Sequence, residues 1–217
     1  MKNITIKRLI LASQSPRRKE LLEQAGVNFD IVPADIEERR MASEETSDYV
    51  KRLSREKAQF VAQKFIDSDF IADGKCISES ISKNTPNIWV LGADTTVVVG
   101  NELLEKPTSE DNARLMLRTL SGKTHIVYTG FTLCSESECK IITRLVETEV
   151  LFKRVTEREI DWYIATGEPF DKAGAYAIQG LGAFMVKSIN GSYSNVVGLP
   201  VCEVIELLTQ EGIIEMC

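Results

Sequence analysis

Apolar and polar residues follow one another in the first part of this 217-residue chain in blocks that predict a strand, a helix and a second strand. The apolar run at residues 9–12 is typical of a buried strand. Ser15 is a good N-cap and Pro16 suits the first helical position. The helix that they start should end before Gly26, and residues 29–32 predict the second strand.

The next block predicts a longer helix and then a loop. Thr46 or Ser47 can cap a helix that continues to about residue 64. Residues 67–87 instead combine Asp-Gly, polar runs and Asn-Thr-Pro-Asn, which are typical of loops. We interpret them as an exposed insertion, which can carry a short helix. Decoration of the surface is its simplest role, because surface loops accept added residues at low cost in free energy, and covering a cleft or making a subunit contact stays open.

A further strand is predicted to end at Asp94. The apolar run at residues 88–93 is typical of a buried strand, and residues 96–99 continue in an extended form. Gly100 and Asn101 predict a hairpin turn, after which the chain returns beside this strand in a second strand that contains Leu103 and Leu104.

The rest of the chain adds helices, strands and turns. The expected elements are a helix from Thr108 to Leu120, strands at 126–134 and 141–152, a helix capped by Thr156 and Glu159, a strand at 185–189 with an Asn-Gly hairpin turn after it, and a last helix from Pro200 to Leu208. Because strands alternate with helices and hairpins are mixed in, the pattern predicts an α/β fold with a mixed sheet.

Composition narrows the choice of partners. The 26 basic and 32 acidic residues give a net charge of −6, which argues against nucleic acid as the main partner but not against a nucleotide. Five cysteines without a Cys-x-x-Cys motif fit free thiols in a reducing compartment. No apolar run reaches the roughly 18 to 20 residues of a membrane span, and the N-terminus lacks the pattern of a signal peptide. We therefore expect a cytoplasmic protein that binds neither nucleic acid nor a membrane.

The first candidate for chemistry is the segment Ser-Gln-Ser-Pro-Arg-Arg at residues 13–18, which joins a strand to a helix N-terminus. A helix N-terminus favours an anion. Ser13 and Ser15 offer hydroxyl groups. Arg17 and Arg18 offer forked donors that match phosphate oxygens. The segment predicts a phosphate site, although a plain helix start with solvated arginines accounts for the same residues about equally well.

The second candidate is Asp94, which lies at the end of a buried strand, where open α/β sheets place their ligands. It can hold a hard cation or take a proton from water. We expect the small neighbours Gly92 and Ala93 to leave room for a substrate. Alone, Asp94 would more simply be a turn aspartate.

Other charged residues are predicted to support Asp94. They are Glu38 after the second strand, Lys57 on the long helix, and Glu105 and Lys106 beyond the hairpin. Together they supply carboxylates for magnesium and cations for phosphates, which phosphoryl chemistry requires. A Ser-His-Asp triad is disfavoured because the single histidine, His125, has no nucleophile elbow near it, so we interpret it as structural. Cys202 lies on an apolar helix and is interpreted as a core residue.

Taken together, these segments resemble the Maf family of nucleotide pyrophosphatases. The resemblance covers nearly the whole chain in the family's order, and its segments are jointly specific. They are LASQSPRR at 11–18, LSREKA at 53–58, LGADT at 91–95, EKP at 105–107, LSGKTH at 120–125, GEP at 167–169, KAGAY at 172–176, IQGLG at 178–182 and VGLP at 197–200.

The resemblance implies an extended sheet flanked by helices, two lobes with an active-site cleft between them, a divalent metal such as magnesium or manganese, and frequently a homodimer. The implied reaction is attack of water on the α-phosphorus with release of pyrophosphate. Asp94 matches the proton acceptor. Ser13, Arg18, Lys57 and Lys106 match phosphate-binding positions, and Glu38, Asp94 and Glu105 match positions at the metal.

Three positions resemble the branch of the family that hydrolyses dTTP and UTP: Arg17, Thr95 and Gln179. The branch that acts on 7-methyl-GTP typically has a non-arginine residue, a glutamine and a glutamate there. The Gln179 amide offers a donor and an acceptor, which suit the edge of uracil or thymine. CTP, modified pyrimidine nucleotides and 7-methyl-GTP stay open as substrates. A nucleotide-binding regulator of septum formation without turnover is the alternative from another class.

Overall fold

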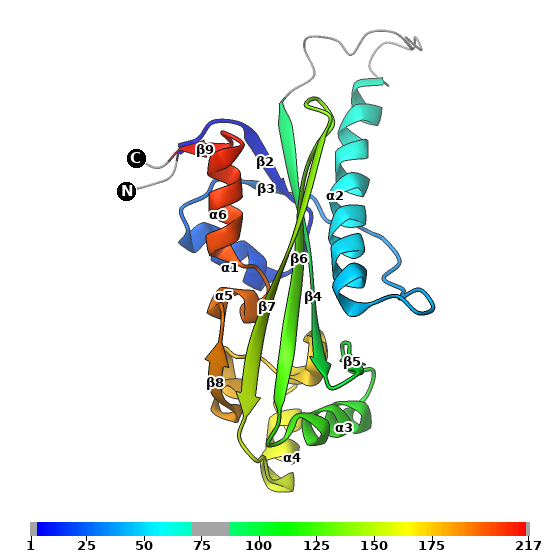
Figure 1. The fold of residues 1–217 in the computed structure, drawn as a ribbon, viewed down its shortest axis with the longest axis vertical. Coiled ribbons are helices and arrows are strands. Elements are labelled where there is room, and N and C mark those ends of the chain that lie inside the picture. The colour runs from blue at the N-terminus through cyan, green and yellow to red at the C-terminus, as the bar shows by residue number, and fades with distance from the viewer. Residues whose placement is uncertain (1–3, 71–86, 216–217) are drawn as a thin grey trace. The chain divides into compact units, whose positions relative to one another are not determined.

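The structure, a computed structural model, describes residues 4–70 and 87–215 (Figure 1). Its strands are β1 Ile4–Thr5, β2 Arg8–Leu11, β3 Asp30–Ile31, β4 Ile88–Val99, β5 Glu102–Leu104, β6 Thr124–Ser135, β7 Lys140–Phe152, β8 Val186–Asn190 and β9 Ile214–Glu215. Its α-helices are α1 Pro16–Gln24, α2 Thr46–Phe70, α3 Glu110–Leu120, α4 Glu157–Ala165, α5 Tyr193–Val197 and α6 Val201–Gln210, and three 3-10 helices are η1 Glu168–Asp171, η2 Ala173–Ala175 and η3 Gly180–Met185.

Seven of the described strands form one mixed sheet in the order β3-β2-β4-β6-β7-β8, with β5 paired to β4. β2 runs parallel to both β3 and β4, whereas β5 and β8 run antiparallel to their neighbours. This confirms the predicted α/β fold with a mixed sheet. The short antiparallel pair of β1 and β9 was not predicted, because two-residue strands carry no periodic signal.

The chain divides into two compact units. Unit 1 consists of Met1–Asp94, Gly130–Arg144 and Val201–Cys217, and unit 2 consists of Thr95–Thr129 and Leu145–Pro200. The long strands β4, β6 and β7 each contribute residues to both units. The cleft that the resemblance implies between two lobes stays a prediction.

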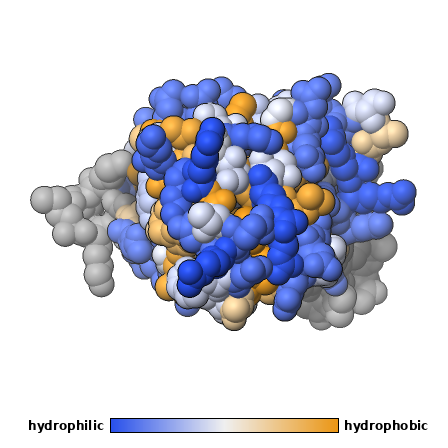
Figure 2. Space-filling model, turned by 90° about the horizontal axis from the view of Figure 1, so that it is seen from below, coloured by the Kyte–Doolittle hydropathy of each residue, from blue (hydrophilic) through white to orange (hydrophobic). Residues whose placement is uncertain are grey.

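Each unit has its own apolar core. In unit 1 a buried cluster joins β2, α2 and β4 through Ile10, Ala12, Ala58, Val61, Ala62, Ile88, Val90 and Cys134. In unit 2 a larger cluster joins α3, α4 and the strand segments beside them, and includes Val97, Leu104, Leu117, Leu120, Val127, Phe152, Ile160, Tyr163, Tyr176 and Met185. The face in Figure 2 is largely polar, with apolar side chains scattered among the charged ones.

Helix α2 is longer than the pattern indicated. It continues to Phe70, so residues 67–70 of the interpreted insertion are helical. The reason is visible in the sequence, because no glycine or proline interrupts the chain between Thr46 and Asp73. Residues 71–86 of that insertion lie outside the described part of the chain.

The structure confirms one predicted helix start, moves another by one residue and contradicts a predicted hairpin turn. Thr156 and Glu159 form the predicted capping box of α4. The cap of α3 is Ser109 and not Thr108, since the Ser109 hydroxyl accepts from Asn112 N–H. The Asn190-Gly191 hairpin prediction was wrong: the chain enters α5, because the Ser192 hydroxyl caps that helix by accepting from Asn195 N–H.

The position of Cys202 on α6 differs from the prediction. Cys202 is exposed, which corrects its assignment to the core. The buried face of α6 carries Val204, Leu207 and Leu208, and a residue two positions before Val204 points about 200° away from it.

None of the described helices has the length and apolar character needed to cross a bilayer.

His125 is buried in the core of unit 2. Its Nε2 lies 2.7 Å from the Tyr176 hydroxyl, and its ring makes edge-on contacts with Phe152 and Tyr176. Burial lowers the pKa of His125 to about 4, so the ring is neutral at physiological pH. This environment is that of a structural histidine.

The buried neutral state of His125 predicts a loss of stability in mild acid. Between pH 6.5 and about 4 the unfolded chain binds a proton at this residue that the folded chain does not, so the free energy of unfolding falls as the pH is lowered, by up to about 3 kcal/mol. His125→Gln should flatten this pH dependence, whatever its own stability. Urea unfolding of both proteins at intervals from pH 7 to 4.5 measures the difference, and parallel curves would contradict it.

Candidate active site

The turn from β2 into α1 is organised by Ser13. Pro16 occupies the first position of α1, and Ser15 is its N-cap residue, but the Ser15 side chain makes no capping hydrogen bond. Instead the buried Ser13 hydroxyl accepts from Ser15 N–H and from Arg18 Nη1, each at 3.2 Å. Arg18 therefore lies beside the N-terminus of α1, where backbone N–H groups and the helix dipole favour an anion.

Arg18 also interacts electrostatically with the acidic residues of unit 1. Its burial lowers its pKa, as does Arg17, while Asp94 and Glu38 act in the opposite direction. An arginine remains protonated under such shifts. The turn at residues 13–18 and the carboxylates of Asp94 and Glu38 thus belong to one charged site.

The centre of this site is the Lys57 ammonium. It lies 2.6 Å from Asp94 Oδ1 and 2.6 Å from Glu38 Oε1. Lys57 and Asp94 are both buried, with exposed side-chain fractions of 9% and 10%, whereas Glu38 is 44% exposed. Burial raises the pKa of Asp94, and Glu38 raises it further, while Lys57 and Arg18 oppose the change. A carboxylate with a raised pKa is a stronger base.

The close approach of α2 to β4 brings Lys57 to Asp94. A Cβ atom on Gly92 would lie 2.3 Å from the Ser54 carbonyl oxygen and 2.7 Å from Ala58 N, so the helix backbone rests directly on this strand position. We expected the space beside Gly92 to admit a substrate, and that was wrong, because α2 fills it. Lys57 sits on the helix between these two contacts.

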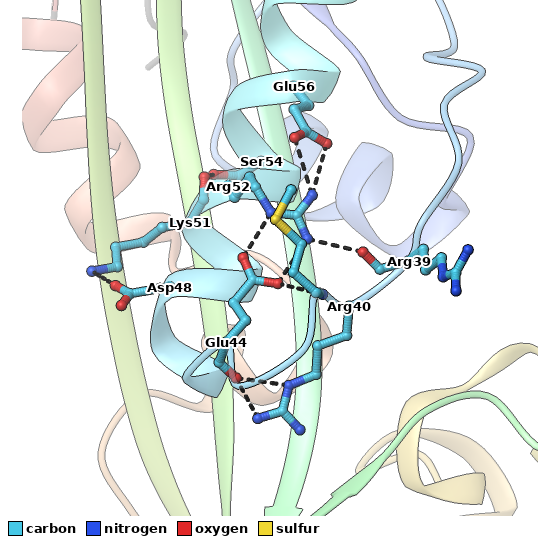
Figure 3. A network of polar contacts seen from close by, with 9 residues as sticks. Arg39, Arg40, Glu44, Asp48, Lys51, Arg52, Ser54 and Glu56 are labelled. Carbon is cyan, nitrogen blue, oxygen red and sulfur yellow. Dashed lines mark hydrogen bonds and ion pairs between the residues drawn. The ribbon is translucent and has the colours of Figure 1, made fainter.

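A network around Arg52 holds the segment that carries Glu38 against α2 (Figure 3). The Arg52 guanidinium donates to both Glu44 oxygens at 2.7 and 2.8 Å, to Glu56, and to the Arg39 carbonyl at 2.9 Å. The hydrogen bond from Arg52 is the main cause that lowers the pKa of Glu44 to about 2. Arg39 directly follows Glu38, so the network fixes the backbone next to that carboxylate.

The remaining predicted residues belong to unit 2. The Thr95 hydroxyl lies 3.0 Å from the Thr129 hydroxyl and 3.3 Å from the Gly198 carbonyl, and so it ties β4 to the turn after α5. Gln179 is half-buried and is the N-cap residue of η3. Thr95 is therefore held within its unit through its side chain, and Gln179 lies at the start of a 3-10 helix.

Glu105 and Lys106 follow β5 in unit 2 and are exposed. The Glu105 carbonyl accepts from Gly174 N–H at 3.1 Å, which binds this segment to η2. The structure thus gathers six predicted residues in unit 1, namely Ser13, Arg17, Arg18, Glu38, Lys57 and Asp94, and assigns four to unit 2, namely Thr95, Glu105, Lys106 and Gln179.

Carboxylate oxygens are suitable ligands for magnesium or manganese. One carboxylate oxygen of Glu38 and one of Asp94 face the same position, which the Lys57 ammonium occupies. Within the described ranges no group of three or more His, Cys, Asp or Glu residues is arranged to hold a metal ion. Magnesium is usually bound by one or two carboxylates together with substrate phosphates and water, and this pair fits that requirement.

Comparison with known families shows which family this chain belongs to. A family model described as "Maf-like protein" matches residues 8–211. The chain belongs to the Maf family. A protein of Syntrophus aciditrophicus named dTTP/UTP pyrophosphatase is 45% identical over 205 residues, which is 94% of this chain and 90% of that protein. Proteins with the same name from Myxococcus xanthus, at 46% over 94% and 93%, and from Geobacter sp. strain M21, at 45% over 98% of both chains, are also similar.

Sequence reasoning missed some residues that shape this Maf-family site. Arg52 and Glu44 were overlooked because a charged pair eight residues apart, across a loop and a helix start, has no local signature. Glu168 was noted only as part of the GEP segment, yet its carboxylate accepts three hydrogen bonds. A charged residue beside a glycine-rich stretch is the only signal that could have indicated it.

Replacing Gly92 should separate Lys57 from Asp94. Gly92→Ala forces α2 away from β4 and should cost about 1–3 kcal/mol or more of unfolding free energy. Because Lys57 is the main cation that lowers the pKa of Asp94, that pKa should rise further in the variant. Urea unfolding and NMR titration of the carboxyl group measure both effects.

Gly100→Ala is the matched control for this substitution. Gly100 has a φ of +60° and open space around its Cβ position, so alanine there adds strain of about 1–2 kcal/mol without displacing a neighbour. The pKa of Asp94 should then match that of the parent protein. A Gly92→Ala protein with parental stability and an unchanged Asp94 pKa would contradict the packing argument.

Proposed function

We propose that this Maf-family protein is a dTTP/UTP pyrophosphatase, which hydrolyses these nucleotides to the nucleoside monophosphate and pyrophosphate. The observation that carries the proposal is the buried contact of Asp94 with Lys57, beside Glu38 and the Ser13–Arg18 turn. The names of its relatives, at 45–46% identity over nearly their whole length, support the same activity.

Asp94 is the proton acceptor in this proposal. A water oxygen attacks the α-phosphorus, the bond from that phosphorus to the bridging oxygen breaks, and pyrophosphate leaves. The proton of the attacking water goes to Asp94, whose raised pKa favours its uptake. Burial of the carboxylate also strengthens its electrostatic interaction with nearby charges.

The phosphates are held by cations and by a helix N-terminus. Lys57 and Arg18 exchange their present partners for phosphate oxygens, and the Ser13 hydroxyl and the start of α1 add donors. Lys106 is proposed as a further phosphate ligand. Glu38 and Asp94 would hold a magnesium or manganese ion, which neutralises phosphate charge when it is bound, and Glu105 is proposed as a further ligand.

Base recognition is assigned to Arg17, Thr95 and Gln179. The Gln179 amide can donate to one carbonyl of uracil or thymine and accept from the ring N–H. The Thr95 hydroxyl already bonds within unit 2, so we assign it the support of the base pocket and not a direct contact. CTP and modified pyrimidine nucleotides are further candidate substrates. A homodimer, a cytoplasmic location and the absence of nucleic-acid and membrane partners stay predictions.

The first test is pyrophosphate release from a panel of nucleotides with magnesium or manganese. The panel contains dTTP, UTP, CTP, modified pyrimidine triphosphates, dGTP and 7-methyl-GTP. We expect turnover of dTTP and UTP, and a loss of about 10²- to 10⁴-fold in Asp94→Asn with the fold retained. Asp30→Asn is the control, because it removes an exposed carboxylate that pairs with Arg8.

The other outcomes separate the alternatives. Full activity in a folded Asp94→Asn protein would refute the assignment of the base. Turnover of 7-methyl-GTP alone would retain the chemistry and overturn the specificity. Nucleotide binding without any turnover would instead favour the regulator of septum formation.

A substitution at Gln179 tests base recognition. Gln179→Glu replaces a donor and acceptor pair by a negative charge, so it should lower kcat/KM for dTTP about tenfold relative to 7-methyl-GTP, whose base is positively charged. Steady-state kinetics with both nucleotides give this ratio. Gln210→Glu, at an exposed position near the end of α6, is the control and should leave the ratio unchanged. An unaltered ratio in Gln179→Glu would remove Gln179 from the base pocket.

A further inference from the structure

The Glu168 carboxylate, in η1, has a role that the proposed mechanism does not use. Its Oε1 accepts from the Tyr163 hydroxyl at 2.9 Å and from Gly182 N–H at 3.0 Å. Its Oε2 accepts from Leu181 N–H at 3.0 Å. One half-buried side chain thus binds two consecutive backbone N–H groups of η3, thirteen and fourteen residues further along the chain.

These contacts begin two residues after Gln179. Gly180 has a φ of +67°, and a Cβ atom there would come within 2.9 Å of Glu168 Oε2. A glycine is therefore needed both for the backbone conformation and for the approach of the carboxylate. The chain leaves Gln179, turns at Gly180 and is held at the next two residues by Glu168.

Tyr163 holds the chain on the other side of Gln179. Its hydroxyl donates to Glu168 and accepts from Ala177 N–H at 3.2 Å. The ring is buried in the core of unit 2, so the hydroxyl has a fixed position. Gly182 allows this packing, because a Cβ atom there would lie 2.6 Å from the hydroxyl oxygen. Glu168 and Tyr163 together bracket Gln179 from Ala177 to Gly182.

The electrostatics favour an ionised Glu168. Burial acts to raise its pKa, but the N–H groups of Leu181 and Gly182, the Tyr163 hydroxyl and the charge of Lys172 outweigh burial and lower it. Lys172 also donates to the Glu168 carbonyl at 2.6 Å, which fixes the backbone of η1. An ionised carboxylate only accepts hydrogen bonds, at about four lone-pair positions, and protein donors occupy three of them here.

We propose that Glu168 is a positioning residue for base recognition, which holds the turn from Ala177 to Gly182 so that the Gln179 amide faces the nucleotide base in one fixed geometry. The inference rests on the proposed role of Gln179. Glu168 acts through the backbone of η3 and does not touch the substrate. Its loss should therefore change which base is accepted far more than the rate of the phosphate chemistry.

The experiment is a double-mutant cycle with Glu168→Gln and Gln179→Ala. Glutamine keeps the size of the side chain but turns one acceptor into a donor, which would face an N–H group of η3. Alanine is used at position 179 because a glutamate there would add a second negative charge next to the turn. The readout is kcat and KM for dTTP and dGTP in each of the four proteins.

Glu168→Gln should raise KM for dTTP about tenfold, with kcat changed less than about twofold, and should lower the preference for dTTP over dGTP accordingly. In the Gln179→Ala background the same substitution should change the preference less than about twofold, because the group that it positions is absent. Glu157→Gln is the matched control: it removes a carboxylate from α4 that binds Arg118 through two hydrogen bonds, and it should change neither constant.

The outcomes separate the inference from the function on which it rests. If Gln179→Ala leaves the preference unchanged, Gln179 does not read the base and both ideas fail. If Gln179→Ala changes the preference but Glu168→Gln does not, or if the two effects are additive, only the positioning role is overturned. Should Glu168→Gln fail to fold, Tyr163→Phe removes one of the two supports, and it should shift the preference in the same direction only while Gln179 is present.

Discussion

The contact between helix α2 and strand β4 at Gly92 is the constraint on which the charged site depends. A helix backbone can rest on a strand only where the strand has no side chain, and a Cβ atom at Gly92 would lie only 2.3 Å from the Ser54 carbonyl oxygen. The same arrangement recurs on β6, where Gly130 faces the backbone at Val50. Two glycines on different strands therefore set the height of α2 over the sheet. That height determines whether the Lys57 ammonium reaches Asp94 or stops short of it.

Loops on this scaffold are fixed by charged side chains that bind backbone groups. Arg52 donates a hydrogen bond to the carbonyl of Arg39, which follows Glu38. Glu168 accepts a hydrogen bond from the N–H of Leu181, two residues after Gln179. Such loops lack the hydrogen-bond ladder of a strand or helix, so their backbone groups need other partners. Charge-assisted hydrogen bonds are stronger than neutral ones and hold their direction well. In both cases the charged residue lies outside the predicted site and the neutral backbone transmits its effect.

The fold was predictable from the sequence where the signals are local. Hydrophobic runs located β2, β4, β6 and β7 to within two residues, and the Thr156 and Glu159 pair gave the start of α4. Asn190-Gly191 misled because Ser192, one residue later, starts a helix that competes with a hairpin. In the site, residue types and the family resemblance indicated Asp94, Lys57 and Glu38, and the structure brings them together. The supports Arg52, Glu44 and Glu168 depend on contacts across folded elements, which no local pattern records.

The charge balance of the unit 1 cluster explains why the proposed chemistry needs more than this cluster. The three cations Lys57, Arg17 and Arg18 face the two carboxylates of Asp94 and Glu38, so the site as it stands carries a net charge of only about +1. A nucleoside triphosphate brings several negative charges into partly buried surroundings, where unbalanced charge is costly. In the proposed mechanism Lys57 turns to a phosphate, so Asp94 loses the main cation that lowers its pKa and becomes a stronger base. In this mechanism Lys106 and a divalent cation would supply the further positive charge for the phosphates, and this would link substrate binding to the proton transfer that follows.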